Sequence, residues 1–266
     1  MSNRKLRLDS LLVESGLFAD QKTARSWILS GKVMVNDKSV AKAGILVPID
    51  ATLRVKGIEN KYVSRGGLKL ERALERFPIS VRGKVILDAG ASTGGFTDCL
   101  LKFGAARVFA VDVGFGQIRG QISSDPRVVS MEKTNISNIA LIDLNPPIDL
   151  CTVDLSYLSL VKAVPILSQL FVKPVQMTCL FKPLYEGVPE TRKNDLNEHH
   201  RALIRLEESL SPQGYAISNL IVSPILGNRG AIEYLLHIHR ENAPSQFENI
   251  LREALEEAKQ LAVSFG

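Results

Sequence analysis

The spacing of apolar residues along the chain changes near residue 84. Before it, apolar residues recur at helical spacing in two short stretches between residues 4 and 30, and strand-like runs follow from Val33 to Val55. After it, short apolar runs alternate with segments of helical periodicity. Such alternation is typical of a doubly wound sheet with mostly parallel strands. The pattern therefore predicts an α/β body preceded by a small α+β module.

Seven strands are expected in this body, each an apolar run bounded by turn residues. They are Lys84–Asp88, Arg107–Asp112, Val128–Ser130, Ile148–Asp154, Val175–Phe181, Tyr215–Val222 and Glu233–His239. The helices predicted among and after them include Phe96–Phe103, Leu158–Leu170, Glu198–Leu210 and Gln246–Val263. Ahead of the body, Ser64–Gly67 is expected to form a turn and Leu68–Phe77 a helix. We thus expect an N-terminal module at 1–60, a linker and lead-in helix at 61–83, and the main domain at 84–266.

Basic residues are concentrated near the N-terminus. Residues 1–76 contain 15 Lys and Arg against 8 Asp and Glu, whereas residues 77–266 contain 18 against 20. This asymmetry indicates a polyanion-binding module joined to a near-neutral body, with a merely soluble basic surface as the alternative. No apolar run is long enough to span a bilayer, and the first residues lack the apolar stretch of a signal peptide. We therefore expect a cytoplasmic protein.

A glycine-rich turn follows the first strand of the body. Gly90, Gly94 and Gly95 come after Asp88, and glycines permit a tight turn and close approach of backbone to a ligand. Asp112 ends the next strand, where a carboxylate can accept hydrogen bonds from the ribose hydroxyls of an adenosine. The turn lacks the Gly-x-Gly-x-x-Gly spacing and the lysine of a P-loop, which bind phosphates.

These features favour S-adenosylmethionine, which is cationic and carries no phosphate. The residues predicted to bind the cofactor belong to the turn and to nearby strand ends. They are Asp88, Gly90, Ala91, Ser92, Thr93, Gly94, Gly95, Phe96, Asp112, Asn135 and Asp154.

The same turn also contains Gly-x-Ser-x-Gly, the nucleophile elbow of serine hydrolases, at Gly90–Gly94. A hydrolase also needs a late histidine that a carboxylate orients. His237 and His239 lie inside an expected strand instead of on a loop at its end. We therefore interpret Ser92 as a residue of the cofactor loop and not as a nucleophile.

Two further strands end in charged residues, Asp154 and Lys182. The carboxyl ends of strands in doubly wound folds face the ligand crevice, so both side chains are expected near the cofactor. A lysine there is a suitable base for a ribose 2′-hydroxyl, provided that its pKa falls. Desolvation or a second cation, for which Lys69 is the candidate, would lower the pKa of Lys182. Either residue alone would be read as a solvated surface group.

Several strings of residues together resemble one family. They are Tyr62–Leu70 (Tyr-Val-Ser-Arg-Gly-Gly-Leu-Lys-Leu), Asp88–Asp98, Asp112–Gly114, Asp154–Tyr157 and Lys182–Pro183. They resemble the TlyA, or hemolysin A, family of ribosomal RNA 2′-O-methyltransferases. The resemblance implies a Rossmann-like, seven-stranded methyltransferase domain of the FtsJ kind that uses S-adenosylmethionine and no metal. It also implies cytidine-directed methylation, ribosomal RNA or ribosomal subunits as partners, and no stable membrane association.

The resemblance further implies a Lys-Asp-Lys-Glu catalytic tetrad. Lys69, Asp154 and Lys182 match its first three members, and Glu233 fits the fourth. Lys182 would remove or hold the hydroxyl proton, Lys69 would lower the pKa of Lys182, and the two carboxylates would orient and balance the lysines. The chain departs from the family pattern before the glutamate, where residues 229–231 are inserted after Gly227-Asn228. It departs again at Lys182-Pro-Leu-Tyr-Glu186, where Lys-Pro-Gln-Phe-Glu is usual.

Residues 4–60 resemble the RNA-binding module named after ribosomal protein S-four. The resemblance rests on Arg7-Leu-Asp9, Ala24-Arg25 and Gly31-x-Val33-x-Val35-Asn36, whereas Gln21-Lys22 replaces the usual Ser-Arg. The basic residues predicted to bind RNA are Arg4, Lys5, Arg7, Lys22, Arg25, Lys32 and Arg65. Two other functions remain open at this point: a membrane-active, hemolysin-like protein, and an RNA-binding protein without catalytic activity.

Overall fold

The structure, a computed structural model, divides the chain after Lys61 into two units, Met1–Lys61 and Tyr62–Gly266. It describes residues 5–15, 17–18, 20–49, 51, 53–57, 61–227, 230–240 and 247–265. Arg4, Asn228 and Arg229, named above, lie outside these ranges. From Tyr62 onward, the segment expected to be a linker and lead-in helix belongs to the second unit.

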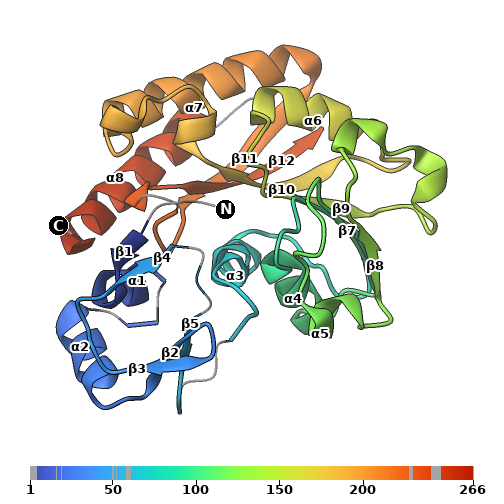
Figure 1. Cartoon of the computed structure of the whole chain (residues 1–266). Helices are drawn as coiled ribbons and strands as arrows, with labels where there is room; N and C mark the ends of the chain where they lie inside the picture. The colour runs from blue at the N-terminus through green and yellow to red at the C-terminus, as the bar shows by residue number, and fades with distance from the viewer. Residues whose placement is uncertain are drawn as a thin grey trace. The chain divides into compact units, whose positions relative to one another are not determined.

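The first unit combines two helices with short strands (Figure 1). Its elements are β1 (Lys5–Arg7), α1 (Leu8–Glu14), α2 (Gln21–Leu29), β2 (Val33–Val35), β3 (Lys38–Val40), β4 (Leu46–Pro48) and β5 (Leu53–Val55). Strand β1 pairs with β4, and β2 lies between β3 and β5. Asn36 and Asp37 both have positive φ, which suits the tight turn between β2 and β3. The core of the unit includes Leu8, Leu12 and Ile28.

The second unit contains a seven-stranded sheet in which every strand expected from the sequence is present. Its elements are α3 (Gly66–Arg76), β6 (Val85–Ala89), α4 (Gly95–Lys102), β7 (Arg107–Val111), α5 (Gly120–Ser123), β8 (Val128–Met131), β9 (Leu150–Val153), α6 (Leu160–Ser168), β10 (Gln176–Phe181), α7 (Leu196–Leu210), β11 (Tyr215–Val222), β12 (Tyr234–Arg240) and α8 (Phe247–Phe265). The strand order is β11-β12-β10-β9-β6-β7-β8. Strand β12 is antiparallel to both of its neighbours, and the other pairs are parallel. The predicted fold class, Rossmann-like and mostly parallel, is therefore confirmed.

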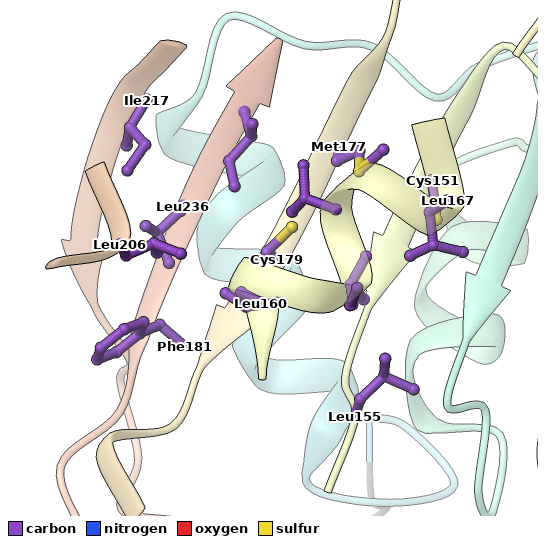
Figure 2. Close-up of a cluster of buried hydrophobic side chains, with 14 of the residues drawn as sticks. Cys151, Leu155, Leu160, Leu167, Met177, Cys179, Phe181, Leu206, Ile217 and Leu236 are labelled. Carbon is purple, nitrogen blue, oxygen red and sulfur yellow. The ribbon is translucent and has the colours of Figure 1, made fainter. Parts of the chain in front are cut away.

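Helices cover both faces of this sheet (Figure 1). Residues of α6, α7 and α8 share one apolar cluster with the sheet, and residues of α3 and α4 share another. Figure 2 shows part of the first cluster, where Leu160 and Leu167 of α6 lie over Cys151, Met177 and Cys179 of the strands. With both faces covered, the strands are apolar on both sides, as expected of parallel sheets.

Most boundaries lie within about two residues of their predicted positions, but the turn expected at Ser64–Gly67 is partly helical. Gly66 and Gly67 were expected to form a turn, but they begin helix α3. A Cβ atom on Gly67 would lie 2.2 Å from the ring of Tyr62, and one on Gly66 would lie 3.3 Å from the ring of Phe96. Close packing inside the second unit therefore requires glycine at position 67, and it leaves position 66 tightly packed against Phe96.

Candidate active site

The glycine-rich turn leaves β6 directly beside the end of β9. The N–H groups of Gly90 and Ala91 donate to the carbonyl of Val111 at 2.9 and 3.0 Å, which closes the turn against β7. Gly90 has a φ of +91°, and a Cβ atom there would lie 2.3 Å from the main-chain oxygen of Asp154. Only glycine fits this position, because the backbone approaches so closely. The turn and Asp154 therefore lie against each other at the carboxyl ends of neighbouring strands, the edge at which doubly wound folds bind their ligands.

Asp112 holds the outer side of the turn. Its Oδ2 accepts a hydrogen bond from the N–H of Ser92 at 2.8 Å, and its Oδ1 accepts one from Gly114 at 2.7 Å. An ionised carboxylate has about four acceptor positions. Asp112 is partly exposed, so it retains acceptor capacity for the hydroxyls of a ligand. Asn135 is also partly exposed, and its side chain caps the turn at Ser137.

Asp88 is placed differently from its prediction as a cofactor-binding residue. The side chain is fully buried, and it accepts hydrogen bonds from the hydroxyls of Thr97 at 2.6 Å and Thr152 at 2.9 Å. Burial raises the pKa of Asp88 to about 6, against the lowering effect of these hydrogen bonds. We therefore assign Asp88 to the support of the turn, where it joins β6 to α4 and β9. Phe96 is likewise buried, so its ring contributes to packing.

Ser92 lies apart from the histidines that a hydrolase would need. Its hydroxyl donates to Gln117 at 3.4 Å. His237 is inside β12, as expected; its Nδ1 lies 3.0 Å from the hydroxyl of Ser218, and its ring stacks on Phe77. The geometry therefore agrees with the interpretation of Ser92 as a loop residue.

The four side chains of the predicted tetrad form two ion pairs. Lys182 Nζ lies 2.5 Å from Asp154 Oδ1, and Lys69 Nζ pairs with Glu233 Oε2. The side chains of the second pair are 10% and 5% exposed, and those of the first are 12% and 22% exposed. The pairs also act on each other, since Lys69 lowers the pKa of Asp154 and Glu233 raises that of Lys182. A residue of α3 and residues just after β9, just after β10 and just before β12 thus meet at one place.

The pKa of Lys182 moves in the direction opposite to the prediction. Burial lowers the pKa of this lysine, but Asp154, Glu233 and the hydrogen bond to Asp154 raise it, and the net direction is upward. For Asp154, burial raises the pKa, whereas Lys182 and Lys69 lower it to below its ordinary value. The expectation of a lowered Lys182 pKa is wrong because the nearby carboxylates outweigh the effect of burial. The resting site is therefore an ammonium beside a carboxylate.

Two main-chain hydrogen bonds fix the described residues around Glu233. The N–H of Gly227 donates to the carbonyl of Ala231 at 2.8 Å, and that of Ser223 donates to the carbonyl of Glu233 at 2.8 Å. A Cβ atom on Gly227 would lie 1.9 Å from Glu233 Oε1. Glu233 therefore lies in the site despite the insertion. It was expected to be the first residue of the last strand, but it immediately precedes β12.

The Ser-Arg-Gly-Gly segment packs against the end of the glycine-rich turn, where helix α4 begins. A Cβ atom on Gly95 would lie 2.1 Å from the hydroxyl oxygen of Ser64. The N–H of Val63 donates to Asp98 Oδ2, on α4, at 2.8 Å. The Ser-Arg-Gly-Gly segment and the glycine-rich turn, which are far apart in the sequence, therefore pack together. Lys69 lies two residues after this segment, on α3. Arg65, predicted to bind RNA, is partly buried there.

The other residues predicted to bind RNA lie in the first unit. Those that the structure describes are all exposed, namely Lys5, Arg7, Lys22, Arg25 and Lys32. Arg7 and Arg25 flank the buried carboxylate of Asp9 at 2.8 and 2.7 Å. Hydrogen bonding from Arg7, with a smaller contribution from Arg25, lowers the pKa of Asp9 to about 2 despite its burial.

Comparison with known proteins places this geometry in a family. Residues 62–240 match the FtsJ-like methyltransferase family. The chain belongs to that family. It is similar, at 41% identity over 90% of the chain and 87% of the relative, to the Bacillus subtilis protein named "Putative rRNA methyltransferase YqxC".

Two further relatives cover nearly the whole chain. The first is "16S/23S rRNA (cytidine-2'-O)-methyltransferase TlyA" of Mycobacterium tuberculosis, at 34% identity over 99% of both chains. The second is a solved structure titled "Putative hemolysin from Streptococcus thermophilus", with a TM-score of 0.78, 32% identity and 97% of both chains covered. The resemblance to TlyA and hemolysin A stated from the motifs is therefore confirmed, and the enzyme is a methyltransferase.

The second unit contains polar residues at the site that were not predicted from the motifs. Ser156 accepts a hydrogen bond from Lys182 Nζ at 2.8 Å, and Thr97 and Thr152 hold Asp88. Ser156 lies within the string Asp154–Tyr157, so its position two residues after Asp154 was the available signal. In the parts of the chain that the structure describes, no helix has the length and apolar character needed to cross a membrane.

Proposed function

We propose that this methyltransferase uses S-adenosylmethionine to methylate ribose 2′-hydroxyls of ribosomal RNA, and that cytidine is its target nucleoside. The main support for the proposal is the presence of two ion pairs, Lys182–Asp154 and Lys69–Glu233, beside the glycine-rich turn. Lysines beside a hydroxyl acceptor can hold its oxygen and balance the charge that develops on it. The names of the YqxC and TlyA relatives support ribosomal RNA as the substrate, and that of TlyA supports cytidine. A ribosomal substrate also favours a cytoplasmic location.

The residues around the turn fit S-adenosylmethionine. Gly90 lets the turn pack directly on the main chain of Asp154, the partly exposed Asp112 offers acceptors for ribose hydroxyls, and Asp154 brings a negative charge. Residues 88–96 include no lysine or arginine that would favour a phosphate. We infer that the backbone from Gly90 to Gly95, with Ser92, Thr93, Asp112, Asn135 and Asp154, holds the cofactor. When bound, S-adenosylmethionine supplies an electrophilic methyl group.

The side chains of the site would act mainly by position and charge. Lys182 in its resting, protonated form would hold the acceptor oxygen, while its ammonium pairs with Asp154 and donates a hydrogen bond to Ser156. Once Lys182 is neutral, it can accept the hydroxyl proton. Lys69, fixed by Glu233, would stabilise negative charge on the same oxygen. Holding the reacting groups in place would also contribute to the rate enhancement, because their translational and rotational entropy is lost on binding and not in the transition state.

We further propose that the first unit is the RNA-binding module of the S-four kind that its motifs resemble. Its exposed lysines and its arginine pair on Asp9 would contact phosphates, which gives affinity without reading sequence.

Incubation of purified protein with ribosomal subunits and S-adenosylmethionine labelled in its methyl group tests the proposal. The expected result is label in 2′-O-methylcytidine of the ribosomal RNA. Label confined to bases, or to protein, would refute a hydroxyl acceptor. Absence of any label, with cofactor binding retained, would refute ribosomal RNA as the substrate.

A further inference from the structure

The loops that carry Asp154 and Lys182 are joined to each other at two points. The first point is the site itself, where Lys182 Nζ contacts Asp154 and Ser156. The second lies four or more residues further along each loop. There Glu186 Oε1 accepts a hydrogen bond from the N–H of Leu160, the first residue of α6, at 2.7 Å. Glu186 thus ties the chain after β10 to the chain after β9.

This contact replaces a missing helix cap. Ser159 occupies the N-cap position of α6, but its side chain makes no capping hydrogen bond. The first N–H groups of a helix have no partner within the helix, and they favour a negative charge nearby. Glu186 supplies the accepting oxygen from another loop, in contrast to the usual cap from the preceding residue.

The segment between Lys182 and Glu186 is short and internally bonded. The N–H of Tyr185 donates to the carbonyl of Lys182 at 2.8 Å, and the N–H of Glu186 donates to that of Pro183 at 3.0 Å. Arg205 of α7 donates to the main-chain oxygen of Glu186 at 3.4 Å. A displacement of Glu186 would therefore be passed to Lys182 through this single tight turn.

We propose that Glu186 is a positioning residue that holds Lys182 against Asp154 by fastening its loop to the start of α6. The inference rests on the proposed function for its kinetic consequence. The carboxylate acts through the loop, since the partner of its Oε1 is the N–H of Leu160. Burial raises the pKa of Glu186 to about 7, against the lowering effect of the Leu160 hydrogen bond, which agrees with an enclosed and not a solvated carboxylate.

Two substitutions separate the proposed role from general stability. Glu186→Ala removes the acceptor, and Glu186→Gln keeps an oxygen that can accept from Leu160. The matched control is Asp149→Ala, because Asp149 Oδ2 accepts from the N–H of Val85 at 2.9 Å and so joins β9 to β6 at the opposite ends of those strands. Steady-state kinetics with ribosomal subunits, cofactor binding by calorimetry and thermal melting are measured for all three.

Because a small misplacement of a reacting group can cost up to about a hundredfold in rate, we expect Glu186→Ala to lower kcat by about ten- to a hundredfold. KM for RNA and the Kd of the cofactor should stay close to wild type. Glu186→Gln should recover most of kcat, and Asp149→Ala should lower the melting temperature without lowering kcat. Wild-type kcat in Glu186→Ala, or an equal kcat loss in Asp149→Ala, would overturn the inference.

A second readout is independent of the reaction and therefore holds even if the proposed function fails. NMR of lysine side chains labelled with ¹³C reports the titration of Lys182, assigned by the signal that disappears in Lys182→Arg. Looser contact with Asp154 in Glu186→Ala should move the pKa of Lys182 downward, because the carboxylates raise it in the intact site. An unchanged Lys182 titration would overturn the inference, whereas absence of methylation by the wild type would refute only the proposed function.

Discussion

At the residue scale, Lys182 combines burial with two neighbouring carboxylates that keep it charged. We predict that Lys182→Ala lowers methyl transfer by about 10²- to 10⁴-fold, the usual range for loss of a proton-transferring group. Cofactor affinity, measured by calorimetry, should change little. The matched control is Lys173→Ala, which removes an exposed lysine paired with Asp149. Full activity in Lys182→Ala would contradict the assigned role.

The same residue predicts a shift in the pH dependence. Asp154 favours the ammonium form of Lys182, so Asp154→Asn removes that stabilisation and lowers the pKa of the lysine. If neutral Lys182 accepts the proton, the wild-type rate should still be rising at a pH of about 9.5, since even an ordinary lysine has a pKa of about 10.4. The rate of Asp154→Asn, although lower overall, should level off at a lower pH. If the rate of Asp154→Asn levels off at the same pH as that of the wild type, or at a higher pH, the result would contradict this account.

Site residues could be predicted from the sequence where their position at the end of a strand determines their location in the fold. Asp154 and Lys182 follow apolar strands, and parallel strands put such ends together. The partner of Lys69 could not be found in this way, because Glu233 is 164 positions away and meets it only through the sheet order. The direction of the Lys182 pKa shift also depends on which charges surround it. No spacing in the sequence fixes that balance.

At the scale of elements, the packing of the Ser-Arg-Gly-Gly segment on the start of α4 should control cofactor binding. We predict that Gly95→Ala weakens S-adenosylmethionine binding, because the added Cβ would lie 2.1 Å from the Ser64 hydroxyl oxygen. Ser64→Ala in the same chain should restore part of the affinity, since it removes the colliding atom. Calorimetry of both single variants and the double variant measures the coupling.

Gly120→Ala serves as its control, because a Cβ atom at Gly120 meets nothing within 4 Å. Independent, additive effects of the Gly95 and Ser64 substitutions would contradict the proposed packing of the two motifs.

Periodicity was sufficient to predict the strands of the sheet and most of its helices, because their apolar faces are long. It was insufficient where packing overrides local preference. Helix α3 begins at Gly66, although two consecutive glycines ordinarily favour a turn. Glycine occupies position 67 because the ring of Tyr62 leaves no room for a Cβ there. Strand β1 was missed for another reason: it has three residues, and its partner β4 lies about forty residues away.

At the scale of the whole molecule, the basic first unit should make RNA binding depend strongly on salt. We predict that replacing Lys5, Lys22 and Lys32 together by Gln makes the plot of log affinity against log salt less steep. The slope should fall by about one unit for each phosphate that a lysine no longer neutralises. All three lysines are exposed. Affinity is measured by titration with ribosomal RNA at several salt concentrations.

The control for this charge series is Lys259→Gln on α8, an exposed lysine that pairs only loosely with Glu256, at 3.9 Å. Its slope should equal that of the wild type. A triple variant with an unchanged slope would contradict the assignment of the first unit to phosphate binding.

We propose that the protein methylates ribose hydroxyls of ribosomal RNA, and that the paired lysines and carboxylates beside the glycine-rich turn carry out the reaction. Mass-spectrometric mapping of 2′-O-methyl groups on ribosomal RNA, after incubation of subunits with cofactor and either wild type or Lys182→Ala, tests it most directly. The account predicts discrete 2′-O-methylcytidines that appear with the wild type and are absent with the variant. No new 2′-O-methyl group with the wild type, or the same groups with Lys182→Ala, would contradict it.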